Sequence, residues 1–380
     1  MTSVNMNSNG MTFSGSVRKL TLPISFLLSR FTLLPRHAFL FRIVVLTLAT
    51  VSLTGCGSNE IREHRFSGPT MGTWYNVKII APLSQDECTR IAKALEDTLE
   101  EINQLMSTYV PDSELSLLNA HTAEVPFSLS AKTRTVFSYA LQVSQESDGA
   151  FDVTVGPLVN AWGFGPNTPD TPPTDSEIAT LLERVGFQKL VLDEEAGTIS
   201  KKRADLYCDL SAIAKGYAVD AMAQVLESMG KNNFMVEIGG EIVVRGYNAQ
   251  KEPWRIAIEE PLTETRALHC VLPLQDIALA TSGDYRNFVE VDGKRLSHAI
   301  DPKTGTPIFH ELASVSVLHE SCALADAYAT AILVLGAEKG LAFAESQNLA
   351  VLMLVHDQAD GFREKRSSAF QALFPELPGT

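Results

Sequence analysis

The order of helical and strand-like stretches is the feature that most constrains the fold of this 380-residue chain. Apolar residues recur at helical spacing after the capping box S-Q-D-E at Ser84, and again from Ser211 to about Met229. Between Gly230 and Thr281 the pattern changes to a series of short strand-like runs. Because helices and strands are grouped rather than strictly alternating, the sequence favours an α+β fold over a doubly wound parallel sheet.

Further elements flank this central region. The strand-like runs before the long helix are Lys189–Leu192, Thr198–Lys201 and Leu206–Leu210. After it we expect a strand over Ala313–Leu318, helices over Ala323–Leu335 and Glu338–Gln347, and a last strand over Ala350–His356. Residues 357–380 read as a polar C-terminal tail.

The first 55 residues have the composition of an export signal, because they contain no Asp or Glu. Arg42 precedes an apolar run from Ile43 to Leu53, which has the length of a signal h-region and is short for a membrane span. The run ends in L-T-G-C, which resembles a bacterial lipobox with Cys56 as the lipidated residue. We expect a signal peptide over 1–55, a tether over 56–65 and a folded domain over 66–356. The alternative to a cleaved signal peptide is an uncleaved membrane anchor. The residues before Phe39 are long for the first part of a signal, so translation could also start at Met11.

A lipidated Cys56 predicts a location. The protein would be held by its lipid anchor at the periplasmic face of the bacterial inner membrane, with several acyl chains giving stable attachment.

The charge of the chain excludes one class of partner. Five of its 31 Lys and Arg residues lie in the predicted signal, so the remainder has 26 cations against 45 Asp and Glu, a net charge of −19. A nucleic-acid-binding protein needs a basic face, so we expect no nucleic-acid partner. An anionic ligand would need a metal ion or a few placed cations.

The four remaining cysteines give no metal or disulfide pattern. Their spacing contains no C-x-x-C pair, and each lies in an apolar stretch. Buried free thiols are the favoured interpretation and disulfides the alternative. These residues are Cys88, Cys208, Cys270 and Cys322.

Four segments carry groups suited to chemistry. The first is S-H-A-I-D-P-K-T-G, from Ser297 to Gly305, whose Asp-Pro step forces a turn or an extended segment between two apolar runs. It reads either as a site on a polar loop or as an elaborate turn. The second is D-L-S-A-I-A-K-G-Y, from Asp209 to Tyr217, where an expected strand meets a helix N-terminus. Such a junction can bind an anion with the help of Lys215, although a helix cap beside a solvated Lys is the alternative.

The third segment is A-L-A-D-A-Y-A-T, from Ala323 to Thr330. Asp326 and Thr330 are four residues apart, so both oxygens project from one face of an otherwise apolar helix. A cation or a neighbouring backbone group could satisfy such a carboxylate. The fourth segment, from Gly149 to Gly165, is rich in Gly and aromatic residues. It could line a pocket for a flat ring, or its aromatics could be core residues.

Together these segments belong to an ordered set of motifs that resembles the ApbE family, the FAD:protein FMN transferases. The resemblance covers roughly residues 66 to 356. The other motifs are G-P-T-M-G-T at 68–73, M-S-T-Y at 106–109, D-S-E-L at 112–115, G-G-E at 239–241 and A-T-S-G-D-Y at 280–285.

The resemblance implies a two-lobed α+β fold with antiparallel or mixed sheets flanked by helices. It also implies an enzyme that takes FAD as substrate with a divalent cation, normally Mg²⁺. Members move the FMN half onto a Thr, sometimes Ser, hydroxyl of an acceptor protein and release AMP. Their acceptors are flavoprotein subunits of membrane redox pumps and related proteins that face the periplasm.

The family's site residues can be assigned to matching positions. The residues implied to contact FAD are Met71, Tyr109, Ala150, Phe151, Asp152, Asp209, Lys215 and Ile300. The implied metal ligands are the carbonyl of Ala212, Asp326 and Thr330. Ala329 stands where some members place a second carboxylate, a ligand that water could replace. His298 and Asp301 are candidates for handling the proton of the incoming hydroxyl.

Two other functions are compatible with the motifs. One is an Mg²⁺-dependent FAD pyrophosphatase, in which water attacks instead of the acceptor hydroxyl. The other is a non-catalytic FAD-binding lipoprotein, against which the Asp326 and Thr330 pair argues, because retention of FAD needs no metal.

Overall fold

The computed structural model describes residues 61–122, 125–166, 169, 171–262, 267–283, 288–291, 294–357 and 361–377. The predicted signal peptide and Cys56 lie outside these residues, and the predicted tether is described only from residue 61 onward. Its last four residues, 62–65, already form the beginning of the first strand.

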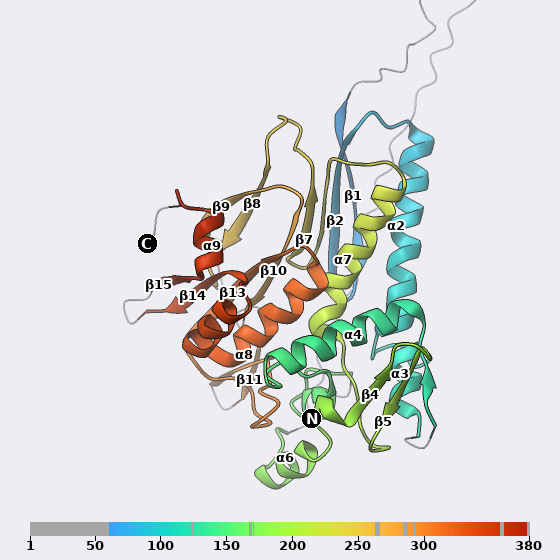
Figure 1. The fold of residues 1–380 in the computed structure, drawn as a ribbon, viewed down its shortest axis with the longest axis vertical. Coiled ribbons are helices and arrows are strands. Elements are labelled where there is room, and N and C mark those ends of the chain that lie inside the picture. The colour runs from blue at the N-terminus through green and yellow to red at the C-terminus, as the bar shows by residue number, and fades with distance from the viewer. Residues whose placement is uncertain are drawn as a thin grey trace, which may run out of the picture. The chain divides into compact units, whose positions relative to one another are not determined.

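One antiparallel sheet of eight strands organises this part of the chain (Figure 1). All neighbouring strands in it pair antiparallel. The strands are, in spatial order, β1 (Arg62–Thr70), β2 (Thr73–Ala81), β6 (Phe234–Ile238), β7 (Glu241–Arg245), β10 (Ile277–Gly283), β13 (Leu312–His319), β14 (Ala350–His356) and β15 (Phe362–Arg366). Helices and antiparallel strands together confirm the predicted α+β class.

Alternating side chains divide the core between the two faces of the sheet. Val243 and Val351 pack into the larger cluster, together with residues of the long helices. Val244 and Leu352, their neighbours in the chain, pack into a second cluster with β8, β9 and α9. The helices of the larger cluster are α2 (Gln85–Met106), α4 (Ala131–Glu146), α7 (Ser211–Ser228) and α8 (Cys322–Ser346). The elements of the second cluster are β8 (Trp254–Glu259), β9 (Leu268–Leu274) and α9 (Ser368–Leu373).

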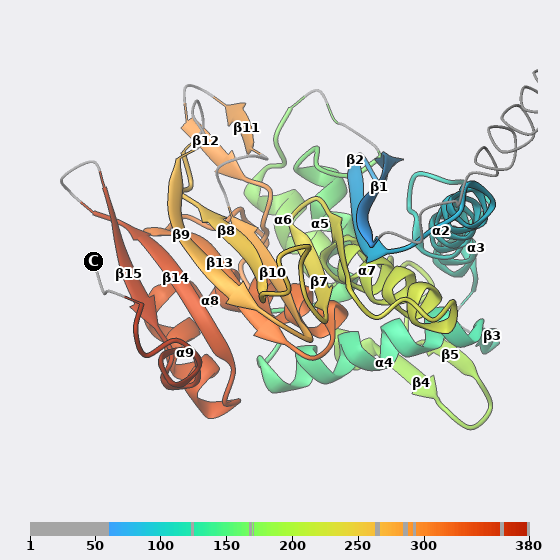
Figure 2. The same ribbon diagram turned by 90° about the horizontal axis from the view of Figure 1, so that it is seen from above.

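Smaller elements complete the described chain, and Figure 2 shows several of them from above. A three-stranded sheet has the order β3 (Phe127–Ser128), β5 (Thr198–Lys201) and β4 (Leu190–Asp193), and β11 (Phe288–Val291) pairs with β12 (Lys294–Ser297). The short helices are α3 (Glu114–Ala120), η1 (Val153–Val155), α5 (Gly156–Ala161), α6 (Asp175–Leu182) and η2 (Phe187–Lys189).

The two predicted helices near the C-terminus form α8, which has one non-helical residue, Gly336, at φ 76° and ψ 174°. Among the described residues, α8 is the single helix long and apolar enough to cross a membrane by length and composition. It packs against β10 and β13, and half of its most apolar stretch is buried, as in a core helix.

The cysteine prediction is confirmed in its main part. The four cysteines of the described chain are free thiols, and those of Cys208 and Cys322 are buried, whereas Cys88 and Cys270 are partly buried.

Two sequence-based expectations differ from the structure. Leu206–Leu210 forms no strand, because the Asn119 side chain bonds the backbone of Cys208 and the Asp209 N–H donates to the Val153 carbonyl. The predicted C-terminal tail instead contains β15, which pairs with β14, and α9, whose Phe370 is fully buried. The charged sequence of β15 suits an edge strand with one solvated face.

Candidate functional site

The crossing of α7 and α8 creates the site. Gly216 lies at the contact, where a Cβ atom would be 2.3 Å from the carbonyl oxygen of Cys322. One turn further along α7, Asp220 accepts hydrogen bonds from Ser321 Oγ at 2.8 Å and from the backbone N–H groups of Cys322 and Ala323 at 2.9 and 3.0 Å. A side chain of α7 therefore caps the first turn of α8, which fixes the two helices against each other.

We predict that Asp220→Ala lowers the free energy of unfolding by about 2 kcal/mol, because it leaves two backbone donors of a partly buried helix end without their acceptor. Urea unfolding followed by circular dichroism measures the change. Asp97→Ala is the matched control, since the Asp97 side chain is 62% exposed in a surface ion pair and its loss should change stability by less than about 0.5 kcal/mol. Equal losses from both variants would contradict the capping role.

A cluster of three charged side chains lies beside this crossing. Lys215 Nζ of α7 is 3.5 Å from Asp326 Oδ2 of α8 and 3.4 Å from Glu241 Oε1 at the start of β7. The backbone N–H of Gly216 also donates to Asp326 Oδ2, at 3.0 Å. Asp326 is 2% exposed and Glu241 is 3% exposed. Two buried carboxylates thus share one ammonium group.

Burial dominates the electrostatics of this cluster. It raises the pKa of Asp326, although Lys215 and the Gly216 N–H oppose the shift. Burial also raises the pKa of Glu241 to about 8, again against the charge of Lys215. For Lys215, burial acts to lower the pKa, but Asp326 and Glu241 outweigh it and raise the pKa. With all three groups ionised the cluster carries one net negative charge, which favours a cation.

The predicted metal ligands are compatible with this arrangement. Within the described residues Asp326 Oδ1 has no hydrogen-bond partner, because both side-chain contacts of Asp326 use Oδ2. Thr330 follows one turn later on α8, and its Oγ1 is 3.3 Å from Ser282 Oγ of β10. The Gly216 N–H is the regular helical partner of the Ala212 carbonyl, and it also donates to Asp326, so Ala212 lies beside the carboxylate.

The described residues contain no group of three or more His, Cys, Asp or Glu side chains suited to a metal ion. A cation at Asp326 would therefore need hydroxyl, carbonyl or water oxygens as its other ligands, which are the donors that Mg²⁺ prefers. Ala329 is fully buried and contributes no ligand at the position of a second carboxylate. The alternative reading of Asp326, a carboxylate bonded to neighbouring backbone, is also partly realised by Gly216.

The loop from Ser297 to Gly305 is a braced turn. Asp301 Oδ1 accepts from the Lys303 N–H at 2.8 Å, and the Asp301 carbonyl accepts from the Gly305 N–H at 2.8 Å. Trp162 Nε1 donates to the Gly305 carbonyl at 2.8 Å. The candidate Asp301 thus uses one carboxylate oxygen to shape the turn, which leaves the other for chemistry.

Aromatic side chains connect this loop to the other predicted contacts. The His298 ring lies edge-on to Phe164, with ring centroids 6.4 Å apart. Tyr109 donates from its hydroxyl to the Phe164 carbonyl at 3.3 Å, and its side chain is 64% exposed. Burial of its inner part raises the pKa of Tyr109, and the negative charge of Asp209 adds to the shift. The structure therefore places Tyr109 and His298 on either side of Phe164.

Several predicted FAD contacts have buried side chains. Ala150 and Phe151 are 4% and 2% exposed. Asp152 accepts from Thr154 N and Oγ1 through Oδ1 and from Phe187 N through Oδ2, so internal bonds occupy both oxygens. Burial nevertheless raises the pKa of Asp152. Such residues can contact a ligand mainly through the backbone that they position.

Ile300 and Met71 complete the predicted set. The Ile300 side chain is buried in a small apolar cluster with Leu158 and Ile178. Met71 and Gly72 form the two-residue turn between β1 and β2, with φ of 46° and 72°. Positive φ at both positions is typical of a type I′ hairpin turn, and the Met71 side chain is partly buried against the larger core cluster.

Sequence reasoning assigned no role to Glu241, Ser282 or Asp220. Glu241 and Ser282 belong to the motifs G-G-E and A-T-S-G-D-Y. These motifs could have marked both residues as candidates, but they do not indicate that the side chains are buried or which residues they contact. Asp220 had no local signal, because its partners lie about a hundred residues away in the sequence.

Comparisons with known proteins identify the family of the chain. A sequence profile of the ApbE family matches residues 71–353. A curated relative from Vibrio cholerae, named FAD:protein FMN transferase, is 48% identical over 320 residues, covering 84% of this chain and 95% of the relative. One of the same name from Haemophilus influenzae is 43% identical over 336 residues, covering 87% and 96%.

Solved structures of flavin transferases have a similar fold. The flavin transferase ApbE from Vibrio cholerae aligns with a TM-score of 0.76 and 45% identity, covering 82% of this chain and 99% of that one. The apo flavinyl transferase ApbE of Pseudomonas stutzeri aligns with a TM-score of 0.75 and 37% identity, covering 84% and 98%. The chain belongs to the ApbE family.

Proposed function

We propose that this protein is an FAD:protein FMN transferase that uses Mg²⁺. The acceptor's Thr or Ser hydroxyl oxygen attacks the phosphorus on the FMN side of the FAD pyrophosphate. A phosphoester bond forms, the pyrophosphate P–O bond to the AMP phosphate breaks, AMP leaves, and the hydroxyl loses its proton. The observation that carries the proposal is the buried Lys215, Glu241 and Asp326 cluster at the α7–α8 crossing, in a chain of the ApbE family.

The cluster supplies what phosphoryl transfer needs. The protein contributes positioning and charge stabilisation to such a reaction, with little covalent chemistry of its own. Lys215 lies in the first turns of α7, where its ammonium offsets part of the charge of Asp326 and Glu241. A cation attracted by the remaining negative charge would act together with the α7 N-terminus, so that an otherwise acidic protein could hold the phosphates of FAD.

The same residues fit a divalent cation. Asp326 through Oδ1, the Thr330 hydroxyl and the Ala212 carbonyl would hold Mg²⁺, with water in place of a further carboxylate. When bound, the ion would neutralise charge on phosphoryl oxygens. Glu241 Oε1 lies 3.4 Å from Lys215 Nζ and keeps the ammonium next to this position.

Two groups are proposed for the proton of the acceptor hydroxyl. A base must lie within hydrogen-bond reach of the nucleophile, and an imidazole is suited to the task near neutral pH. We assign His298 as the base and Asp301 as its support in the same turn. Tyr109 is exposed and donates to the Phe164 carbonyl, and the Phe164 ring lies edge-on to His298, so these aromatic groups would provide a surface for the flavin ring.

The acceptor and the location are part of the proposal. We infer that the acceptors are flavoprotein subunits of membrane redox pumps, and that lipidation of Cys56 holds the enzyme at the periplasmic face of the inner membrane. Cys56→Ser should release the protein from the membrane fraction into the soluble fraction. A variant that stays in the membrane fraction would contradict lipid anchoring through Cys56.

The deciding experiment mixes the purified protein with FAD, Mg²⁺ and an acceptor domain that carries its modifiable Thr. We expect the intact mass of the acceptor to rise by one FMN while AMP is released in equal amount. Chelation of Mg²⁺ by EDTA should stop both, and added Mg²⁺ should restore them. AMP and free FMN with an unmodified acceptor would indicate a pyrophosphatase, and bound FAD without products would indicate a storage protein.

A further inference from the structure

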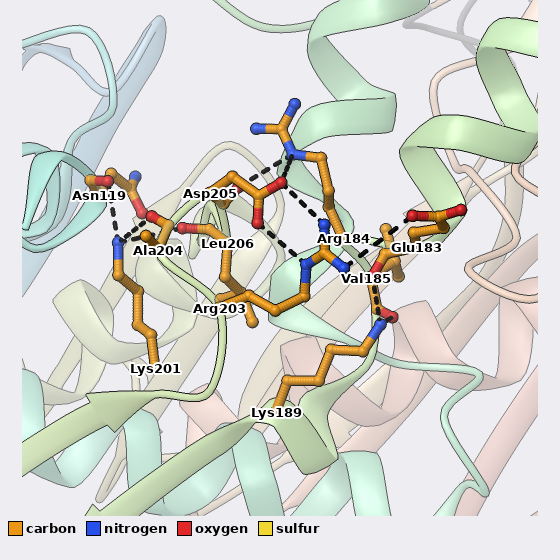
Figure 3. A network of polar contacts seen from close by, with 10 residues as sticks. All are labelled: Asn119, Glu183, Arg184, Val185, Lys189, Lys201, Arg203, Ala204, Asp205 and Leu206. Carbon is orange, nitrogen blue, oxygen red and sulfur yellow. Dashed lines mark hydrogen bonds and ion pairs between the residues drawn. The ribbon is translucent and has the colours of Figure 1, made fainter. Parts of the chain in front are cut away.

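Lys201, the last residue of β5, is a buried lysine that the proposed transfer chemistry does not use. Its residue exposure is 3%. The ammonium group donates to three backbone carbonyls, those of Asn119 at 3.0 Å, Ala204 at 3.1 Å and Leu206 at 3.3 Å (Figure 3). Within the part of the chain that is described, no carboxylate forms an ion pair with it, and burial lowers its pKa.

A buried cation without a carboxylate partner is not expected to increase the stability of the fold, because burying an apolar side chain of similar size costs less free energy. Its three acceptors indicate what it does instead. The carbonyls of Ala204 and Leu206 belong to the connection between β5 and α7, and that of Asn119 belongs to α3. Lys201 therefore ties this connection to a neighbouring helix.

Asn119 forms a second tie to the same connection. Its Oδ1 accepts from the Cys208 N–H at 2.7 Å, and its Nδ2 donates to the Cys208 carbonyl at 2.9 Å. One amide side chain thus makes the two hydrogen bonds that a neighbouring strand would otherwise make. These two bonds satisfy the backbone of Cys208, although Leu206–Leu210 belongs to no sheet.

The tied connection leads directly into the flavin site. The next residue, Asp209, donates its N–H to the Val153 carbonyl at 2.7 Å, which joins it to the segment that follows Ala150 and Phe151. Asp209 Oδ1 also accepts from the Ser211 N–H at 2.8 Å, at the start of α7. The position of Asp209 and of the first turn of α7 depends on where residues 204–208 are held.

We propose that Asn119 and Lys201 are positioning residues for FAD, acting through residues 204–208 on Asp209 and the start of α7. Neither side chain needs to touch the ligand. This inference rests on the proposed function, because it takes Asp209 and the α7 N-terminus to be part of the flavin site.

The test uses two near-isosteric variants of the full chain, Lys201→Met and Asn119→Asp. The first removes all three ammonium donors, and the second places an acceptor against the Cys208 carbonyl. FAD binding is measured by quenching of flavin fluorescence, and kcat is measured at saturating FAD. We expect the Kd for FAD to rise about tenfold or more in both, as for other residues that orient ligand-binding groups, with kcat changed less than about threefold.

Lys231→Met is the matched control, because Lys231 is also largely buried but lies beyond the far end of α7, paired with Glu87. It should leave the Kd for FAD unchanged. Circular dichroism and thermal melting report whether each variant folds. If Lys201→Met does not fold, Asn119→Asp and the milder Asn119→Ser decide the matter.

Variants that melt earlier but bind FAD like the wild type would overturn the inference, since the two residues would then support only the fold. A wild type that binds FAD without transferring FMN would refute the proposed function and leave the positioning role measurable. A wild type that binds no FAD would overturn both.

Discussion

Replacing Asp326 with Asn is expected to lower the rate of FMN transfer about 1,000-fold, which is the scale at which charge-stabilising groups act in phosphoryl transfer. The amide has nearly the same shape, but it supplies no negative charge for a cation and cannot pair with Lys215. The rate is measured from the mass shift of the acceptor under single-turnover conditions. In parallel, the Mg²⁺ concentration for half-maximal rate should rise.

The fold should survive this change, which separates chemistry from stability. Asp326 is 2% exposed, so a neutral side chain there avoids the free energy of burying a charge. Lys215 keeps Glu241 as its ionic partner at 3.4 Å. We therefore expect the melting temperature to stay within a few degrees of the wild type, about the shift caused by 1 kcal/mol. Asp97→Asn, on the surface of α2, is the control and should leave the rate unchanged.

A transfer rate within about threefold of the wild type would show that Asp326 holds neither the cation nor Lys215 in the reacting complex. The charged cluster would then be a structural feature of the helix crossing. The proposed function would lose the observation that carries it.

Periodicity predicted the elements that support the site, because their signals are local. The apolar stripe predicted α7 nearly to its ends, and apolar composition predicted α8 as two helices that the structure joins into one. The spacing of Asp326 and Thr330 placed both oxygens on one helix face. The contacts that complete the site are not local. Glu241 follows two glycines and begins an apolar strand, and nothing in that stretch indicates that Lys215 lies 3.4 Å away.

The incorrect prediction of a strand at Leu206–Leu210 also results from contacts that are distant in the sequence. Leu206, Cys208 and Leu210 alternate as a half-buried strand would, and all three are buried. The pattern records burial correctly but not the identity of the hydrogen-bond partner, which is the Asn119 side chain for Cys208. At the C-terminus, the charged residues of β15 give no strand pattern in the sequence. The strand forms because β14 lies beside it and supplies its hydrogen-bond partners.

Gly216→Ala is the second large effect that we expect, and it tests how the site is assembled. The new Cβ would lie 2.3 Å from the Cys322 oxygen, 2.7 Å from its carbonyl carbon and 2.9 Å from the Cα of Ala323. These are backbone atoms in the first turn of α8, so no side chain can rotate away. The helices must separate, and overpacking of this kind costs about 3 kcal/mol.

Separation of the helices should also affect the chemistry, because Lys215 and Asp326 sit on opposite sides of the crossing, 3.5 Å apart. A displacement of about 1 Å can lower a rate about 100-fold. Urea unfolding and the single-turnover transfer rate measure the two effects. Gly361→Ala is the control, since a Cβ there meets no described atom within 4 Å. If Gly216→Ala unfolds earlier but transfers FMN at the wild-type rate, the packing of α7 on α8 holds the fold but does not set the distance on which the reaction depends.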